Sequence, residues 1–300
     1  MPKTKVTLAA LPSLLADTAA NLRLVEQSVE QASAEGARLV VFPELMLTGH
    51  GAHRLMTDNA EPVPDGPLSR AIIDLSARHS VCICVGIAEL EYGIVYNSQI
   101  VADKGRYLGC QRKIHASGDE YVHFAPGRAV PVFDIGELRF GITVCYDSRF
   151  PELSLIHSLN HVDAVVSVHA ARSGVWPEEP DRAFARAKIA ERQESWLRRW
   201  SGRADAYNFF VLLCNAVGPS TAGLDGVVAN HAGSIMAIDP RGNAFVTTER
   251  EEFESEIRTI EIDPDDRVRN HPPTRNRRLD IFQEALTTAL KRHARGGELG

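Results

Sequence analysis

Helical and strand-like patterns alternate along the whole 300-residue chain, and no linker rich in proline, glycine or serine interrupts them. The run 38–42 reads as a short buried strand, whereas residues 17–35 and 181–200 carry apolar side chains at helical spacing. Such alternation is typical of one α/β unit rather than of two domains. We therefore expect a single domain over residues 1–285, followed at 286–300 by the end of a last helix and a tail.

Composition narrows the possible partners. The chain holds 33 basic and 39 acidic residues, a net charge of −6, so it has no bulk attraction to nucleic acid or to an anionic membrane surface. Its apolar runs are too short to cross a bilayer, and we interpret the N-terminal apolar segment as a first strand rather than a signal peptide. These observations favour a small-molecule substrate.

Five cysteines are scattered over the chain, an odd number that does not suggest a disulfide framework. A reducing compartment, the cytoplasm, fits this pattern best. Cys82 and Cys84 alternate within a predicted strand and so point to one face. We interpret them as core residues in preference to a metal-binding pair.

Three reactive side chains each stand directly after a predicted strand, namely Glu44, Lys113 and Cys145. Sites in α/β sheets form at the carboxyl ends of strands, so these groups are expected to meet. A thiol can attack a carbonyl carbon, a carboxylate can take the thiol proton, and an ammonium can stabilise negative charge. Each residue alone is more typical of a solvated loop or a packed core, and only the combination indicates catalysis.

Several other kinds of site lack their sequence signals. The chain has no phosphate-binding loop, no nucleophile elbow around a serine, no dinucleotide fingerprint and no H-E-x-x-H zinc motif. His115 and His123 are close in sequence, but a solvated or hydrogen-bonding role is favoured over a metal site. We therefore expect no cofactor and no metal, and a zinc hydrolase is a less favoured alternative.

The stretches around the three reactive residues resemble the nitrilase, or carbon–nitrogen hydrolase, superfamily. FPELMLTGH surrounds Glu44, RKIH surrounds Lys113 and GITVCYDSRFPE surrounds Cys145, in the order in which the superfamily carries its own blocks. Glu120 matches the second glutamate of the superfamily. The resemblance covers about residues 4–285 and implies an α–β–β–α sandwich, with two mixed sheets face to face and helices outside. It also implies a homodimer or a larger homo-oligomer.

The resemblance assigns roles to these residues. Cys145 is the nucleophile, and Glu44 is the base that later protonates the leaving amine. Lys113 and the backbone N–H of Tyr146 form the oxyanion site, and Glu120 orients Lys113. The implied reaction is hydrolysis of a linear amide or an N-carbamoyl compound through a cysteine thioester, with release of ammonia.

The substrate is less determined by the sequence. Cys-Tyr-Asp after the strand resembles the amidase branches, so a nitrilase is an alternative, and a catalytically silent binding protein on the same fold is another. His169, Arg172 and Trp176 are candidates for the pocket rim, and Arg172 either grips a substrate carboxylate or is a surface arginine. The segment 172–206 is longer and more basic than the usual connection at this place in the superfamily. Its tryptophans favour an outer helix that packs on a sheet.

Overall fold

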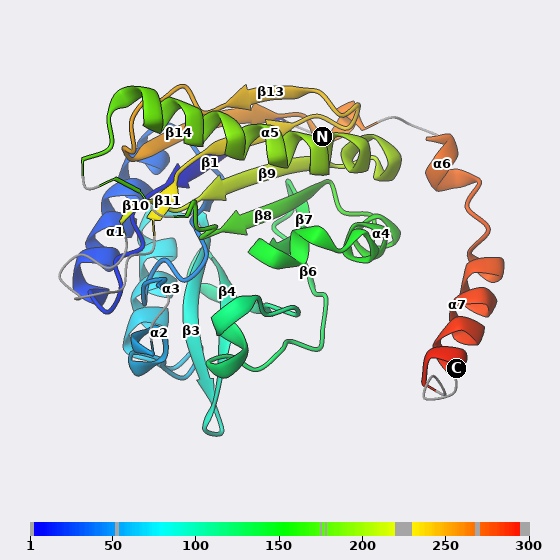
Figure 1. Ribbon diagram of the computed structural model, residues 1–300, viewed down its shortest axis with the longest axis horizontal. Helices are drawn as coiled ribbons and strands as arrows, with labels where there is room; N and C mark the ends of the chain where they lie inside the picture. Colours follow the sequence, from blue (N-terminus) through cyan, green and yellow to red (C-terminus); the bar gives the residue numbers. More distant parts are fainter. Residues whose placement is uncertain are drawn as a thin grey trace.

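The computed structural model describes residues 3–51, 54–174, 176–177, 179–219, 230–267 and 271–294. Two six-stranded mixed sheets face each other, and helices cover their outer faces (Figure 1). This is the α–β–β–α sandwich that the resemblance implied.

The first sheet has the strand order β14-β1-β2-β3-β4-β5. β1, β2 and β3 are parallel, β4 runs against β3, and β5 runs against β4. As a result, β2, β3 and β5 end at the same edge of the sheet. The strands are β1 (Thr4–Ala10), β2 (Leu39–Val41), β3 (Cys82–Glu91), β4 (Ile94–Asp103), β5 (Arg106–Arg112) and β14 (Glu256–Ile262).

The second sheet has the order β13-β12-β9-β8-β7-β6, with β7, β8 and β9 parallel. A separate two-stranded ribbon joins β10 and β11. The strands are β6 (Val132–Asp134), β7 (Arg139–Val144), β8 (Ala164–His169), β9 (Phe210–Asn215), β10 (Val217–Pro219), β11 (Asn230–Ala232), β12 (Ile235–Ile238) and β13 (Ala244–Thr247).

α1 and α3 pack on the first sheet, and α4 and α5 pack on the second. α7 stands apart from the body of the molecule (Figure 1). The helices are α1 (Thr18–Ala34), α2 (Leu55–Asp58), α3 (Pro67–His79), α4 (Pro151–Leu159), α5 (Arg182–Tyr207), α6 (Pro272–Arg275) and α7 (Leu279–Ala294). Three 3-10 helices are η1 (Gly118–Val122), η2 (Cys145–Arg149) and η3 (Pro264–Asp266).

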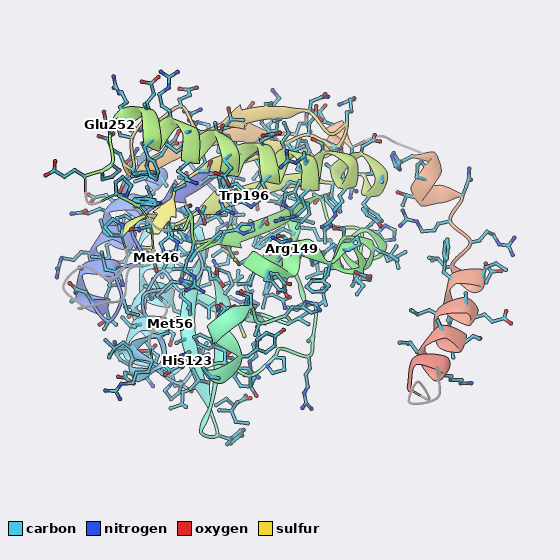
Figure 2. The ribbon with its side chains drawn as sticks, in the orientation of Figure 1. Met46, Met56, His123, Arg149, Trp196 and Glu252 are labelled. Carbon is cyan, nitrogen blue, oxygen red and sulfur yellow. The ribbon has the colours of Figure 1, made fainter. Side chains whose placement is uncertain are left out.

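Successive side chains of a strand point to opposite faces of its sheet, and this alternation produces the apolar layers on both faces. In β9, Leu212 points between the two sheets, whereas Leu213 points outward to α5. On α5, Trp196 and Trp200 are fully buried against this outer face of the second sheet, and Figure 2 shows Trp196 between the helix and the strands. Burial of two indole rings anchors the helix along the sheet. The favoured interpretation of these tryptophans, an outer helix packed on a sheet, agrees with the structure.

Some predicted boundaries were wrong. The helix expected over 181–200 continues to Tyr207 and ends at Asn208, whose φ of 59° stops the helix. The last helix, expected over 276–292, is α7 (Leu279–Ala294), and the short helix α6 (Pro272–Arg275) that precedes it was not expected.

The structure also shows the state of the cysteines and whether a helix could span a membrane. All five cysteines are free thiols, and Cys82 and Cys84 lie in the core between the sheets, as predicted. Within the described residues, no helix combines the length and the apolar character needed to span a bilayer.

Candidate active site

Glu44, Lys113 and Glu120 meet at the carboxyl edge of the first sheet. Lys113 Nζ donates to Glu44 Oε1 at 2.7 Å and to both carboxylate oxygens of Glu120 at 2.7 Å. All three side chains are buried. Because a carboxylate on each side holds the ammonium, its position is set before any substrate arrives.

Glu44 lies in the turn after β2 and connects the two sheets. Its Oε1 accepts a hydrogen bond from Asn97 Nδ2 in β4 at 2.8 Å, and its Oε2 accepts one from the Ala170 N–H after β8 at 2.8 Å. Gly86 in β3 makes room for the turn, since a Cβ there would lie 2.2 Å from the backbone nitrogen of Leu45. Three donors therefore fix the direction of the Glu44 carboxylate.

Glu120 is held in η1 by a capping box. Its Oε2 accepts hydrogen bonds from the Ser117 N–H at 2.8 Å and from Ser117 Oγ at 3.1 Å. On the other side, His50 Nε2 lies 3.9 Å from Glu120 Oε1. Glu120 is therefore rigid and faces Lys113.

Cys145 is the first residue after β7 and has a left-handed backbone, with φ of 51°. This conformation costs a residue other than glycine about 1–3 kcal/mol, so the surrounding structure must hold it. Asp147 supplies one restraint, because its carboxylate accepts hydrogen bonds from the N–H groups of Ile114 at 3.2 Å and His115 at 2.8 Å. The turn that carries the thiol is thus tied to the segment that carries Lys113.

The charges at this site influence one another. Burial raises the pKa of the Cys145 thiol well above its ordinary value, and the Glu44 carboxylate raises it further, against the opposing effect of Lys113. Burial alone would lower the pKa of Lys113, but the neighbouring negative groups outweigh it and raise that pKa. Burial opposes ionisation of Glu120, yet His50 and Lys113 lower its pKa well below the usual range. The thiol is therefore protonated at neutral pH and stands beside a carboxylate and an ammonium.

One group of side chains has the composition of a metal site. Ligand atoms of Glu44, His50 and Glu120 all lie within 4.8 Å of one another. The Lys113 ammonium, however, lies 2.7 Å from both carboxylates and already supplies the positive charge that a cation would bring. The donor set therefore does not fit a metal ion while Lys113 is in place.

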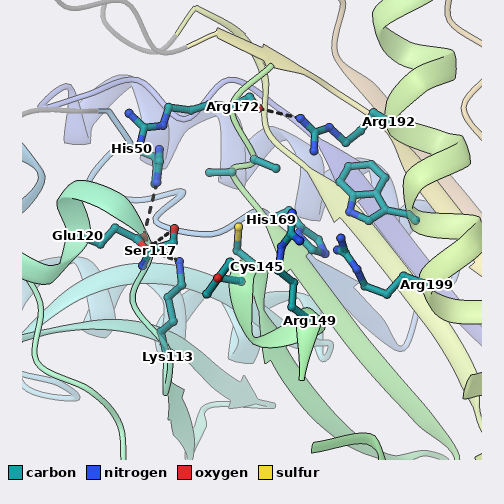
Figure 3. Close-up of a pocket in the computed structure, with 14 residues that line it drawn as sticks. His50, Lys113, Ser117, Glu120, Cys145, Arg149, His169, Arg172, Arg192 and Arg199 are labelled. Atoms are coloured by element: carbon teal, nitrogen blue, oxygen red, sulfur yellow. Dashed lines mark hydrogen bonds and ion pairs between the residues drawn. The ribbon is translucent and has the colours of Figure 1, made fainter. Parts of the chain in front are cut away.

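A cavity of about 230 Å³ opens above these groups, and Figure 3 shows the side chains around it. Lys113, Glu120 and Cys145 line it, together with the predicted Tyr146 and His169. Burial lowers the pKa of His169 well below its ordinary value, and Ser167 Oγ lies 2.8 Å from its Nε2. The imidazole is therefore neutral and fixed.

The two remaining predicted pocket residues differ from each other. Arg172 lines the cavity from the segment after β8, although its side chain is largely exposed. Trp176 is not among the lining residues. Its ring stacks on Phe253 with the centroids 3.7 Å apart and lies edge-on to Phe184. The structure thus places Trp176 in an aromatic cluster beside the start of α5.

Several residues of the site were not recognised in the sequence. Asn97 reads as an ordinary polar residue within a strand, and only the β4 register brings it to Glu44. Arg192 and Arg199 also line the cavity. Arg192 and Arg199 are seven residues apart, and Trp196 lies between them, so a helix places the three side chains on one face. This spacing was the signal in the sequence that could have identified the two arginines. The S-x-x-E pattern at Ser117 similarly marked the capping box.

The model of the carbon–nitrogen hydrolase family matches residues 5–269, nearly the whole sandwich. The chain belongs to this family. The resemblance inferred from the three sequence blocks is thereby confirmed.

Individual carbon–nitrogen hydrolases are similar to this chain over different lengths. A probable nitrilase of Schizosaccharomyces pombe is 31% identical over 170 residues, which cover 55% of this chain and 62% of that protein. An (R)-stereoselective amidase of a Pseudomonas species is 27% identical over 87% of this chain and 85% of its own length. A crystal structure of an amidase from a Nesterenkonia species superimposes with a TM-score of 0.73 at 18% identity, over 94% of this chain and 95% of that one. Amidases and nitrilases thus both occur among the relatives.

Proposed function

We propose that this carbon–nitrogen hydrolase cleaves a linear amide or an N-carbamoyl compound through a thioester at Cys145. The observation that carries the proposal is the Lys113 ammonium, held at 2.7 Å by both Glu44 and Glu120 in the cavity that the thiol lines. A nucleophile, a base and a cation thus converge on one small space. In a glutamate-to-glutamine mutant of a Nesterenkonia amidase, acrylamide adds to the active-site cysteine, which supports a thiol nucleophile.

In the first half of the reaction, Cys145 Sγ attacks the amide carbonyl carbon while Glu44 takes the thiol proton. The raised pKa of the thiol makes this transfer necessary, because little free thiolate exists at neutral pH. Negative charge that develops on the carbonyl oxygen is stabilised by Lys113 and by the backbone N–H of Tyr146. The C–N bond then breaks, Glu44 returns the proton to the leaving nitrogen, and ammonia departs.

In the second half, water attacks the thioester carbonyl carbon and Glu44 takes a proton from it. The C–S bond breaks, the thiol regains its proton, and the acid leaves. Glu120 touches Lys113 and acts through it as a positioning residue. The net balance is one water consumed for one acid and one ammonia formed, and no step uses a cofactor.

A substrate panel tests this proposal. Linear amides, N-carbamoyl amino acids and nitriles are offered to the purified protein, and ammonia release is measured with wild type and with Cys145→Ala. We expect release from amides or carbamoyl compounds with the wild type alone. Release only from nitriles would make the protein a nitrilase. Binding without release from any member would favour a catalytically silent binding protein.

We further propose that the protein acts in the cytoplasm as a homodimer or a larger homo-oligomer built from single 1–285 domains. The five free thiols agree with a reducing compartment. Analytical ultracentrifugation of the full chain tests the assembly, and a monomer throughout the micromolar range would contradict it.

A further inference from the structure

Three arginines line one side of the cavity. Arg149 comes from η2, and Arg192 and Arg199 reach in from α5 (Figure 3). The hydrogen-bond partners found for the two α5 guanidiniums are neutral, since Arg192 donates to the backbone oxygen of Arg172 at 2.7 Å and Arg199 donates to Ser148 Oγ at 2.9 Å. Within the described part of the chain, none of these three arginines forms an ion pair with a carboxylate.

Two partly buried arginines elsewhere in the fold show what a counter-charge looks like. Arg38 is paired with Asp103 and Glu137, and Arg112 is paired with Glu89 and Glu91. The side chains of Arg38 and Arg112 are 13% and 24% exposed, so both charges are held largely out of water. Arg38 and Arg112 are thus each neutralised by two carboxylates, whereas Arg203, which is also partly buried, donates only to the backbone oxygens of Ser148 and Arg149.

The positively charged arginines in the cavity repel one another, and this repulsion affects their pKa values. Burial, followed by repulsion from Arg149 and Arg203, lowers the pKa of Arg199 to about 10. Burial also lowers the pKa of Arg192, and Arg149 acts in the same direction. Positive charges held together without partners destabilise the empty site, and a bound anion would offset the repulsion between them.

The arginines share their space with the reacting groups. Arg192 and Arg199 line the same cavity as Cys145. The cavity of about 230 Å³ is smaller than the roughly 300–1,000 Å³ of sites for drug-sized ligands. An anion held by the arginines and a carbonyl attacked by Cys145 must therefore belong to one small molecule. Lys113 does not compete for that anion, because Glu44 and Glu120 already neutralise it.

We propose that the substrate carries two negative charges at the end remote from its scissile C–N bond, and that Arg149, Arg192 and Arg199 bind them. One carboxylate would leave two of the three cations without a counter-charge, whereas a dianion leaves one. Two carboxylates or one phosphate monoester would supply this charge, and guanidinium groups bind either in bidentate fashion. The inference rests on the proposed function and adds the substrate class.

Calorimetric titration of the Cys145→Ala variant tests this inference without turnover. Three ureido compounds of increasing charge serve as probes: N-propylurea with none, N-carbamoylglycine with one carboxylate and N-carbamoylaspartate with two. We expect the affinity to rise at each step, by about tenfold or more. Dianion binding no tighter than monoanion binding would overturn the inference. Because only binding is measured, failure of the proposed hydrolysis would be seen separately.

Substitutions on α5 locate the subsite. Arg192→Gln and Arg199→Gln should each weaken N-carbamoylaspartate binding by about 10–100-fold and leave N-propylurea unchanged. Arg198→Gln is the matched control, because Arg198 is exposed on the same helix and paired with Glu194. Equal losses for the charged and neutral probes, or an equal loss in the control, would contradict the assignment. Two independent variants guard against misfolding of either one.

Competition with small anions distinguishes a dicarboxylate substrate from a phosphate monoester. At pH 8 inorganic phosphate and succinate are both largely dianionic, so displacement of N-carbamoylaspartate compares the tetrahedral anion with the dicarboxylate at similar charge. Stronger displacement by succinate supports a dicarboxylate substrate, and stronger displacement by phosphate supports a phosphate monoester. If neither anion displaces the probe, the dianion subsite is refuted.

Discussion

The two sides of the cavity differ in whether their charged side chains have partners of opposite charge in the protein. On one side, Lys113 is held between Glu44 and Glu120 at 2.7 Å, so each of these charges has a protein partner. On the other side, the described structure gives Arg149, Arg192 and Arg199 no carboxylate at all. The ammonium of the first side has its counter-charges in the protein, whereas the positive charge of the second side is reduced only when an anion binds.

This difference separates catalysis from recognition. Groups that hold one another are already in position for the chemical step, so their loss should lower kcat. Groups that have no counter-charge in the protein interact with the substrate when it binds, so their loss should raise KM. The following predictions test this division, from the largest expected effect to the smallest.

Loss of the thiol should have the largest effect. Cys145→Ala should abolish ammonia release, because no other group on either side of the cavity can form the thioester. Cys110→Ala is the matched control, since Cys110 is the other thiol that is not fully buried. Full activity in Cys145→Ala would refute the mechanism.

Alkylation gives a second measure of the same thiol. Iodoacetamide should label Cys145 first among the five cysteines, because the cavity gives it access. Its pKa is raised, so the thiolate fraction and the labelling rate should still increase about tenfold per pH unit through the neutral range. Mass spectrometry of samples labelled between pH 6 and 9 measures this slope, and a plateau near neutral pH would contradict the raised pKa.

Glu44→Gln keeps the size of the side chain and removes the base. Turnover should fall by about 100–10,000-fold, with KM little changed. The same substitution removes a negative charge that raises the pKa of Cys145, so the thiol should titrate at lower pH and react faster with iodoacetamide at pH 8. Turnover and labelling should thus move in opposite directions. Near-normal kcat would transfer the role of the base to another residue, with Glu120 the next candidate.

Glu120→Gln should lower kcat by about 10–100-fold, less than the roughly 100–1000-fold expected for loss of a direct oxyanion donor. Glu120 acts by positioning Lys113, so KM should stay near its wild-type value. Ser117→Ala removes one hydrogen bond to the same carboxylate and should give a smaller change in the same direction. A rise in KM with unchanged kcat would place Glu120 on the recognition side instead.

Arg172→Ala should have the smallest effect. KM for carboxylate-bearing amides should rise by less than about tenfold, because the Arg172 side chain is largely exposed and solvent screens its charge. Neutral amides should be unaffected, and added salt should reduce the difference between the two. An effect larger than that of Arg199→Gln would move the centre of anion binding from α5 to the segment after β8.

The sequence by itself predicted which side chains meet on the proposed catalytic side of the cavity. Glu44, Lys113 and Cys145 follow strands that local patterns predict, and strand ends converge wherever parallel strands lie side by side. The same patterns predicted β2 and α1 to within a few residues.

Only the tertiary structure decided the recognition side and the supports of the base. The Ala170 N–H that holds Glu44 is 126 residues away in the chain, and the register of β4 alone turns Asn97 toward the same carboxylate. Periodicity placed Arg192, Trp196 and Arg199 on one helical face, but that face could have pointed to solvent. Packing of Trp196 and Trp200 against the sheet turned it to the cavity. Local sequence sets the period of a helix, whereas its rotation about its own axis depends on what it buries, and contacts distant in sequence decide that.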